Sequence, residues 1–244
     1  MFVSERIMKH SNFFEKETIQ DNDVWFDQEN TGPGTRSQKG LYASFGKRLF
    51  DIGISLALMP IVIPLIAIFY LLTRRDGGPG FFAQERIGRN GRVFKCWKIR
   101  TMLVDAEGVL TRMCKEDPEL AAEWHENQKL QNDPRITRIG HILRKTSMDE
   151  LPQLWNVLIG EMSLVGPRPM LPSQQSLYLS GGDGQSYFSL RPGITGAWQL
   201  DGRGTTSFLS RVRFDNFYHA ELSIWKDVVY LVRTLVVPFR RTGA

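Results

Sequence analysis

An uncharged apolar segment at residues 52–72, IGISLALMPIVIPLIAIFYLL, limits what this chain can fold into more than any other feature. Basic pairs bracket it, with Lys47 and Arg48 before the segment and Arg74 and Arg75 after it. About 20 consecutive apolar residues in a helix are enough to cross the hydrocarbon core of a membrane. The sequence therefore predicts a membrane helix.

Two prolines, Pro60 and Pro64, lie inside this segment. Each removes a backbone donor from a helix and favours a kink. The positive charge is also balanced at the two ends, so the asymmetry that orients a spanning helix is absent. We expect a re-entrant element at residues 41–75, in which two helices separated by a break at Pro60 and Pro64 enter one leaflet and return. A single transmembrane span and a buried core helix are the alternatives.

The rest of the chain predicts one globular catalytic domain and a tail. Residues 1–40 are polar, lack the apolar core of a cleavable signal peptide and contain a Gly-Pro-Gly cluster, so we expect a disordered tail. Residues 76–244 are expected to form the domain. A net charge of +5 favours anionic partners such as phosphates, anionic lipid or nucleic acid. Cys96 and Cys114 lack metal-ligand spacing, which indicates free thiols in a reducing compartment.

A cationic β-hairpin is predicted after the apolar segment. The sequence RNGR at residues 89–92 is a turn signal, and residues 93–99 alternate as a strand does. Alternation places Lys98 and Arg100 on one face of that strand, and both lead into residues 101–102, a plausible entry to a helix. A solvated charged face is the alternative. Residues 105–131 are acidic and predict one or two surface helices without chemistry.

The central stretch at residues 143–169, LRKTSMDELPQLWNVLIGEMSLVGPRP, places Arg144 and Lys145 shortly before the carboxylates of Asp149 and Glu150. A capping box that starts a helix at Ser147 is the structural alternative. That helix would place Pro152 beyond its tolerant first turn, so we expect the helix to begin at Asp149 or later, with both carboxylates at or just before its N-terminus.

Carboxylates and cations in this arrangement suggest phosphate chemistry with a metal. An ionised Asp149 is a competent nucleophile toward phosphorus, and the adjacent Glu150 can hold a divalent cation that neutralises a diphosphate. Arg144 and Lys145 could clamp the same group. An Asp-Glu pair alone remains compatible with a purely structural role.

Over residues 47–242 the sequence resembles the bacterial sugar transferase family, the monotopic polyprenyl-phosphate phosphoglycosyl transferases. The resemblance rests on KRLFDIGIS at residues 47–55, GPGFFAQERIGRNGRVFKCWKIRTM at 78–102, the central stretch and RPGITG at 191–196. It implies transfer of a sugar 1-phosphate from a UDP-sugar to undecaprenyl phosphate, the first membrane step of exopolysaccharide, capsule or O-antigen synthesis. The family accepts UDP-linked glucose, galactose or acetamido sugars, and this sequence does not indicate which.

The resemblance also implies residue roles. Asp149 matches the nucleophile that forms a covalent phosphosugar intermediate, and Glu150 matches the Mg²⁺ partner. Arg144, Lys98, Arg100 and Arg168 match basic motif positions expected to bind substrate phosphates, and Pro64 matches the proline that breaks the membrane helix. Two departures are Ile63, where a serine is usual, and AWQLDGR at residues 197–203, which differs from the family's LWQVSGR.

The implied fold class is α+β: a monotopic membrane protein with an N-terminal re-entrant helix-break-helix, a small β-hairpin and amphipathic surface helices around one catalytic domain. Residues 217–239 read as one such helix, able to lie along a membrane surface or to pack on the core. The implied partners are UDP-sugar, undecaprenyl phosphate and membrane lipid, without nucleic acid, and a homo-oligomer is left open. The implied location is the bacterial inner membrane, with the catalytic domain facing the cytoplasm.

Two other functions remain. A non-catalytic scaffold could use its basic face to bind anionic lipid or nucleic acid. A nucleotidyl transferase or a phosphatase could use the same pair of carboxylates, and it would release diphosphate or inorganic phosphate in place of UMP.

Overall fold

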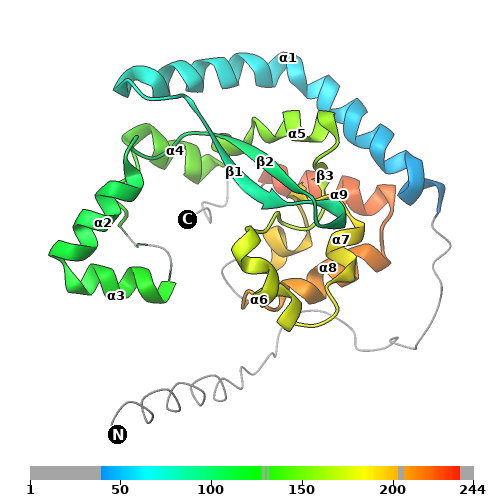
Figure 1. Ribbon diagram of the computed structural model, residues 1–244. Coiled ribbons are helices and arrows are strands. Elements are labelled where there is room, and N and C mark those ends of the chain that lie inside the picture. Colours follow the sequence, from blue (N-terminus) through cyan, green and yellow to red (C-terminus); the bar gives the residue numbers. More distant parts are fainter. Residues whose placement is uncertain (1–39, 128–129, 131, 203–205, 237–244) are drawn as a thin grey trace, which may run out of the picture. The chain divides into compact units, whose positions relative to one another are not determined.

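The computed structural model describes residues 40–127, 130, 132–202 and 206–236, which all belong to the unit Ser37–Ala244. The predicted tail at residues 1–40 lies outside the described residues, apart from Gly40. The helices in chain order (Figure 1) are α1 Lys47–Thr73, α2 Ala106–Glu116, α3 Pro118–Asn127, α4 Arg138–Thr146, α5 Gln153–Ile159, α6 Gln175–Ser180, α7 Gln185–Ser189, α8 Arg211–Ala220 and α9 Ile224–Val236. The strands are β1 Phe81–Ile87, β2 Val93–Ile99, β3 Ser163–Val165 and β4 Gly193–Thr195.

The apolar segment forms one continuous helix, so the predicted helix-break-helix is wrong for this structure. Pro60 and Pro64 both lie inside α1. Each proline leaves the carbonyl four residues earlier without its helical donor, and a helix can accommodate this loss by bending without leaving helical dihedral angles. The ribbon of α1 bends along its length (Figure 1). At about 1.5 Å per residue, α1 is roughly 40 Å long, which is sufficient to cross a membrane.

Buried carboxylates attach the N-terminal part of α1 to the domain. Asp51, which is fully buried, accepts a hydrogen bond from the backbone N–H of Leu164 in β3 at 3.1 Å. Asp227 of α9 accepts hydrogen bonds from Lys47 Nζ at 2.6 Å and from the hydroxyl groups of Tyr42 at 2.5 Å and Tyr218 at 2.6 Å. A buried charge is tolerated only when it is paired in this way, so these contacts fix the position of the helix.

The C-terminal part of α1 touches the same domain. The ring of Tyr70 lies 4.9 Å from the ring of Phe81 in β1, and the carbonyl of Thr73 accepts a hydrogen bond from Arg100. Between these ends, α1 packs on α4, α5, β2 and β3. Both ends of the apolar helix are therefore attached to one charged domain.

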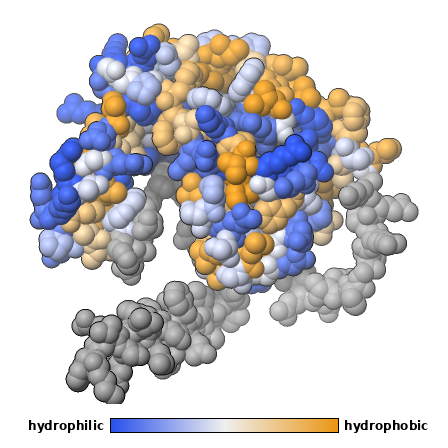
Figure 2. Space-filling model, viewed as in Figure 1, coloured by the Kyte–Doolittle hydropathy of each residue, from blue (hydrophilic) through white to orange (hydrophobic). Residues whose placement is uncertain are grey.

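Most of the apolar surface of α1 remains exposed. Val62 is buried in the core, whereas Leu56, Ile61, Ile63 and Leu71 are more than half exposed. Figure 2 shows apolar residues gathered along the edge that α1 forms in Figure 1. A continuous exposed apolar surface of this kind marks an interaction site, because it is unfavourable in water.

The cationic hairpin is confirmed. Strands β1 and β2 pair antiparallel, with Gln84 opposite Cys96 and Phe82 opposite Lys98. The turn contains Asn90 at φ 58° and Gly91 at φ 73°, a left-handed pair that asparagine and glycine tolerate best. The predicted strand at residues 93–99 matches the bounds of β2.

Asn156 joins α5 to this hairpin and so positions the central stretch. Its fully buried side chain accepts a hydrogen bond from the N–H of Trp97 at 3.1 Å and donates to the carbonyl of Lys95 at 2.8 Å and to the Glu161 carboxylate at 2.6 Å. Nearby, Leu154 and Val157 enter the main hydrophobic core. The helix that follows the two carboxylates is therefore locked onto β2.

A second, short sheet brings two distant motifs together. Strands β3 and β4 pair in parallel, with Ser163 opposite Gly193. A Cβ atom on Gly193 would lie 2.1 Å from the backbone nitrogen of Gly166, so only glycine permits this approach. The sequence VGPRP after β3 consequently lies against RPGITG.

The C-terminal helical region differs from its prediction. The single helix predicted at residues 217–239 is two helices, since α8 ends at Ala220 and α9 begins at Ile224. Residues 237–239 lie outside the described residues. On α9, Ile224, Trp225 and Leu235 are more than half exposed, whereas Tyr230 packs in the core. This helix therefore presents one face to the core and an apolar face outward.

Candidate active site

Asp149 and Glu150 lie in a 3₁₀ turn, Met148–Glu150, between α4 and α5. Ser147 takes the left-handed conformation that ends α4, with φ 57°, and its side chain makes no capping hydrogen bond to this turn. Pro152 is the N-cap of α5. The prediction that both carboxylates precede a helix, without a capping box, is confirmed.

Lys98 of β2 lies between the two carboxylates. Its Nζ is 2.6 Å from Glu150 Oε1 and 3.8 Å from Asp149 Oδ2. Residues that pair directly across the hairpin lie on the same face, so Lys98 shares a face with Phe82. Alternation along β2 places Cys96 on this face as well. The strand thus holds one cation against a pair of like charges.

Burial raises the pKa of Asp149, and Glu150 adds to this effect, whereas Lys98 and Arg144 oppose it. The residue is only 8% exposed. Arg144 of α4 donates from Nε to Thr101 Oγ1 at 2.8 Å, and its charge acts on Asp149. Two of the predicted phosphate ligands, Lys98 and Arg144, are therefore brought to Asp149.

Arg100, also predicted to bind phosphate, is not brought to this group by the structure. Its guanidinium is buried and donates to both carboxylate oxygens of Asp76, and to the carbonyls of Thr73, Pro79 and Met102. The strand ends at Ile99, so the alternation that put Arg100 beside Lys98 does not extend to it. Arg100 ties the end of α1 to the hairpin.

Arg168 lines a small pocket beside Glu150, as part of a turn that is clamped from several sides. Arg211 of α8 donates to the carbonyl of Arg168, and Arg86 of β1 donates to the carbonyl of Pro169 at 3.0 Å. The hydroxyl of Tyr187 accepts from the N–H of Met170 at 3.1 Å. These contacts hold the Arg168 backbone in place while its side chain faces the pocket.

The pocket contains residues that the sequence did not single out. Its volume is about 10 Å³, and it is lined by Arg86, Cys96, Lys98, Glu150, Gln153, Arg168, Pro169, Gly193 and Ile194. The register of the hairpin could have identified Arg86. Alternation along β1 places Gln84 and Arg86 on the face that also carries Cys96 and Lys98. Gln153, only 2% exposed, lies one turn after Glu150 and is a further candidate for contacting substrate.

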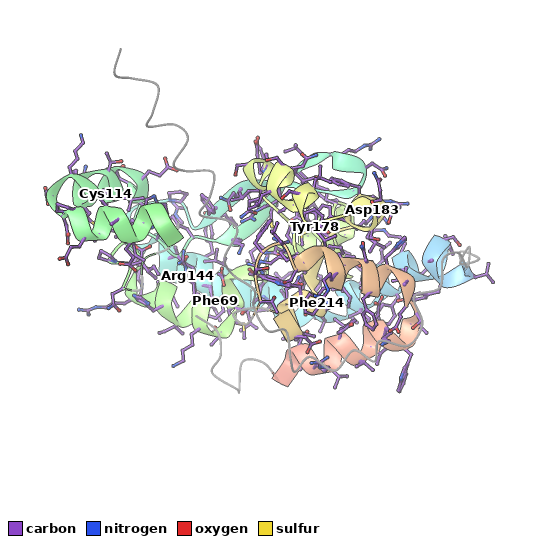
Figure 3. All side chains as sticks on the ribbon, turned by 90° about the horizontal axis from the view of Figure 1, so that it is seen from below. Phe69, Cys114, Arg144, Tyr178, Asp183 and Phe214 are labelled. Atoms are coloured by element: carbon purple, nitrogen blue, oxygen red, sulfur yellow. The ribbon has the colours of Figure 1, made fainter. Side chains whose placement is uncertain are left out.

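Neither cysteine indicates redox chemistry. Cys96 is buried, and burial raises the pKa of its thiol to about 11, so it is not a reactive thiolate at neutral pH. Cys114 lies on the arm formed by α2 and α3, well away from Tyr178 and Phe214 (Figure 3). Both are free thiols, as predicted.

The fit of Mg²⁺ can be judged from the donor set. Magnesium is commonly held by one or two carboxylates together with substrate phosphates and water. Asp149 and Glu150 supply two such carboxylates. Across the described part of the chain, this site included, no group of three or more His, Cys, Asp or Glu side chains could hold a metal. The residues fit a magnesium ion shared with a substrate diphosphate better than one in an all-protein cage.

Replacing Lys98 by glutamine is expected to lower kcat/KM by about 10²-fold, the usual cost of removing one well-placed electrostatic donor. Lys98→Arg, which keeps the charge, should recover part of that loss. The rate of product release at subsaturating substrate measures the change in kcat/KM. A cooperative thermal unfolding transition for each variant excludes misfolding. Equal activity of the two variants would contradict a role for the positive charge.

Asp215 of α8, the helix whose Arg211 binds the carbonyl of Arg168, should make stability depend on pH. Burial raises its pKa to about 7, although a hydrogen bond from Tyr178 at 2.7 Å and the charge of Arg211 oppose this rise. A carboxyl whose pKa is raised on folding contributes stability that is complete below its unfolded pKa, near 4, and is lost as pH rises through about 7. The loss is on the order of 4 kcal/mol.

Thermal unfolding in detergent between pH 4 and pH 8 tests this dependence. The difference in stability between wild type and Asp215→Asn should change across that range, because asparagine keeps an acceptor for Tyr178 but does not titrate. A difference that is constant with pH would show that Asp215 titrates normally.

Comparison with known proteins identifies a family and several relatives to which the chain is similar. Residues 42–241 match the model of a family described as bacterial sugar transferase. The chain is 48% identical over 200 residues to a UDP-galactose-lipid carrier transferase of Erwinia amylovora and 44% identical over 200 residues to an undecaprenyl-phosphate galactose phosphotransferase of Salmonella typhimurium. These matches cover 82% of this chain but only 42% of each relative. A match to exopolysaccharide production protein ExoY of Sinorhizobium fredii, 43% identical over 190 residues, covers 78% of this chain and 83% of that protein.

Proposed function

This chain belongs to the bacterial sugar transferase family, and from that premise we propose that it transfers a sugar 1-phosphate from a UDP-sugar to undecaprenyl phosphate. The observation that carries the proposal is the convergence of Lys98, Arg144 and Arg168 on the turn that holds Asp149 and Glu150. Three cations around two carboxylates suit a reaction in which most of the catalysis is positioning and neutralisation of phosphate charge. The printed names of the relatives support the same reaction.

The proposed reaction has two steps. An Asp149 oxygen attacks the β-phosphorus of the UDP-sugar, the bond from that phosphorus to the bridging oxygen breaks, and UMP leaves. This step forms an acyl phosphate that carries the sugar. A phosphate oxygen of undecaprenyl phosphate then attacks the same phosphorus, which releases the Asp149 carboxylate and forms an undecaprenyl diphosphate sugar. Lys98, Arg144 and Arg168 neutralise the phosphate oxygens in both steps.

Glu150 is the proposed Mg²⁺ partner, and the ion would supply further neutralisation of the diphosphate. Lys98 Nζ now lies 2.6 Å from Glu150, and the pocket beside them is far smaller than a nucleotide sugar. The flexible Lys98 side chain is therefore the group that we expect to shift onto a substrate phosphate, which frees the Glu150 carboxylate.

The attachment of α1 supports a helix that enters the membrane from one side and does not cross it. Lys47 and Asp51 bind the domain near one end of α1, and Tyr70 and Thr73 bind it near the other. A spanning helix of this length would carry one of these ends, with the polar groups that bind it, across the hydrocarbon core, which is costly. We infer insertion from the cytoplasmic side of the inner membrane, where undecaprenyl phosphate meets a soluble UDP-sugar.

Release of UMP tests the function. The purified chain in membrane mimetic should release UMP from a UDP-sugar only when undecaprenyl phosphate and Mg²⁺ are both present under multiple turnover. A panel of UDP-sugars would identify the donor. Release of diphosphate or inorganic phosphate would identify a nucleotidyl transferase or a phosphatase, and absence of any product with every donor would favour the scaffold.

Accessibility of engineered cysteines tests the topology. With Cys114 replaced by serine and Cys96 buried, single cysteines placed before and after α1 should both react with an impermeant reagent only from the cytoplasmic side. Labelling of one of the two from the periplasmic side would contradict the re-entrant arrangement.

A further inference from the structure

A second cavity, larger than the pocket at Glu150, lies under the tip of the β1–β2 hairpin. Its volume is about 400 Å³, within the range of small-molecule sites. The lining combines three arginines, Arg89, Arg92 and Arg191, with an apolar wall. That wall consists of Val93, Phe94 and Ile159. None of these residues takes part in the reaction described above.

Arg48 adds a fourth guanidinium to this region. It donates to the carbonyls of Val157 at 2.5 Å and Leu158 at 2.8 Å, while Arg191 donates to the carbonyl of Gly160 at 2.8 Å. These bonds satisfy the carbonyl end of α5 and fix both guanidinium groups beside it. Carbonyls are neutral acceptors, so the positive charge of the two arginines is not cancelled by them.

The four arginines have no ion pair with a carboxylate among the described residues, where such pairs occur at other basic side chains. Burial lowers the pKa of Arg191, and the charges of Arg89 and Arg48 lower it further, while Asp51 opposes them. The cavity that Arg89, Arg92 and Arg191 line together is the geometric basis for one shared ligand. Glu161, the one carboxylate in the cavity lining, accepts a hydrogen bond from Asn156 at 2.6 Å.

We propose that this cavity is a second anion site, which binds a phosphate group through Arg89, Arg92 and Arg191 and accommodates an adjoining apolar portion on Val93, Phe94 and Ile159. Guanidinium groups match phosphate oxygens in geometry as well as charge. A phospholipid headgroup and a soluble phosphate ester share this chemistry. Arg48 lies in the first turn of α1, next to the exposed Leu49, so a headgroup at the base of the apolar helix could reach the cavity.

Two charge-matched variants separate a built site from general attraction to a basic protein. Arg89→Gln with Arg92→Gln removes two exposed cations from the hairpin tip. Arg112→Gln with Lys115→Gln removes two exposed cations from α2, which lies away from the hairpin tip (Figure 1). The two double variants have the same net charge, so only the position of the loss differs.

Binding is measured in two arms with the full chain. In the first, the chain in uncharged detergent is titrated with inorganic phosphate by calorimetry. In the second, native mass spectrometry counts phosphatidylglycerol retained by the chain from nanodiscs that contain phosphatidylglycerol and phosphatidylcholine. We expect the hairpin variant to bind at least about tenfold more weakly in one arm, and the α2 variant to bind as wild type does. The arm that responds identifies the source of the phosphate.

Val93→Glu provides an independent variant, because it places a carboxylate in the cavity at an exposed position. It should abolish binding while the thermal transition remains cooperative. Equal weakening in the hairpin and α2 variants, unchanged binding in the hairpin variant, or no binding by wild type in either arm would overturn the proposal. None of these outcomes depends on Asp149, so the transferase reaction is tested separately.

Discussion

Asp149→Asn should abolish turnover, with a loss of roughly 10⁴-fold or more, because an amide oxygen cannot form the acyl phosphate. The side chain keeps its shape and its place in the Met148–Glu150 turn. Burial already disfavours the charged form of Asp149, as the raised pKa shows. The neutral amide should therefore fold at least as stably as the wild type, which separates lost chemistry from lost structure.

Transfer of label from a UDP-sugar carrying a radioactive β-phosphate measures this effect directly. Wild type should retain label on the protein when undecaprenyl phosphate is omitted, and Asp149→Asn should retain none. Glu150→Gln is the matched comparison, because it also neutralises one carboxylate of the pair but leaves the nucleophile intact. A labelled Asp149→Asn protein, or one with wild-type turnover, would assign the covalent bond to another residue.

Arg100→Met is expected to lower the free energy of unfolding by about 3 kcal/mol or more, since it leaves Asp76 without its cation and three carbonyls without their donor. Arg100 is almost fully buried, whereas Asp76 is partly exposed, so the ion pair supplies only part of this loss. The variant should also loosen the junction between the end of α1 and the hairpin.

Chemical denaturation in a mild detergent measures the change. Arg75→Met, which removes an exposed cation from the neighbouring turn, should stay within about 0.5 kcal/mol of wild type. If Arg100→Met lost activity with an unchanged free energy of unfolding, the original assignment of Arg100 to substrate phosphate would be restored.

Local patterns predicted the parts of the fold that depend on near neighbours. Asn90 and Gly91 determine the hairpin turn, alternation determines the strand at residues 93–99, and Pro152 sets where α5 can begin. The same local chemistry placed Asp149 and Glu150 together before a helix. Each of these features follows from backbone constraints within a few residues.

Features that depend on distant contacts were not predicted. Arg100 lies two residues after Lys98, but its donors bind Asp76 and the carbonyls of Thr73, Pro79 and Met102, and no pattern in the strand indicates the partners at residues 73–79. The parallel pairing of β3 and β4 joins segments about thirty residues apart. The prolines suggested a break in α1. The structure instead has one continuous helix, which packs on the domain along its length.

The burial of Asp51 at the start of the apolar segment means that α1 is not an interchangeable anchor. A foreign transmembrane helix grafted in its place would carry the chain to a membrane but would offer no acceptor to the N–H of Leu164 and no cation to Asp227. Chimaeras of this protein should therefore exchange the helix and the domain together, as one structural part. The distance of Asp149 from the lipid surface is then a property of that part as a whole.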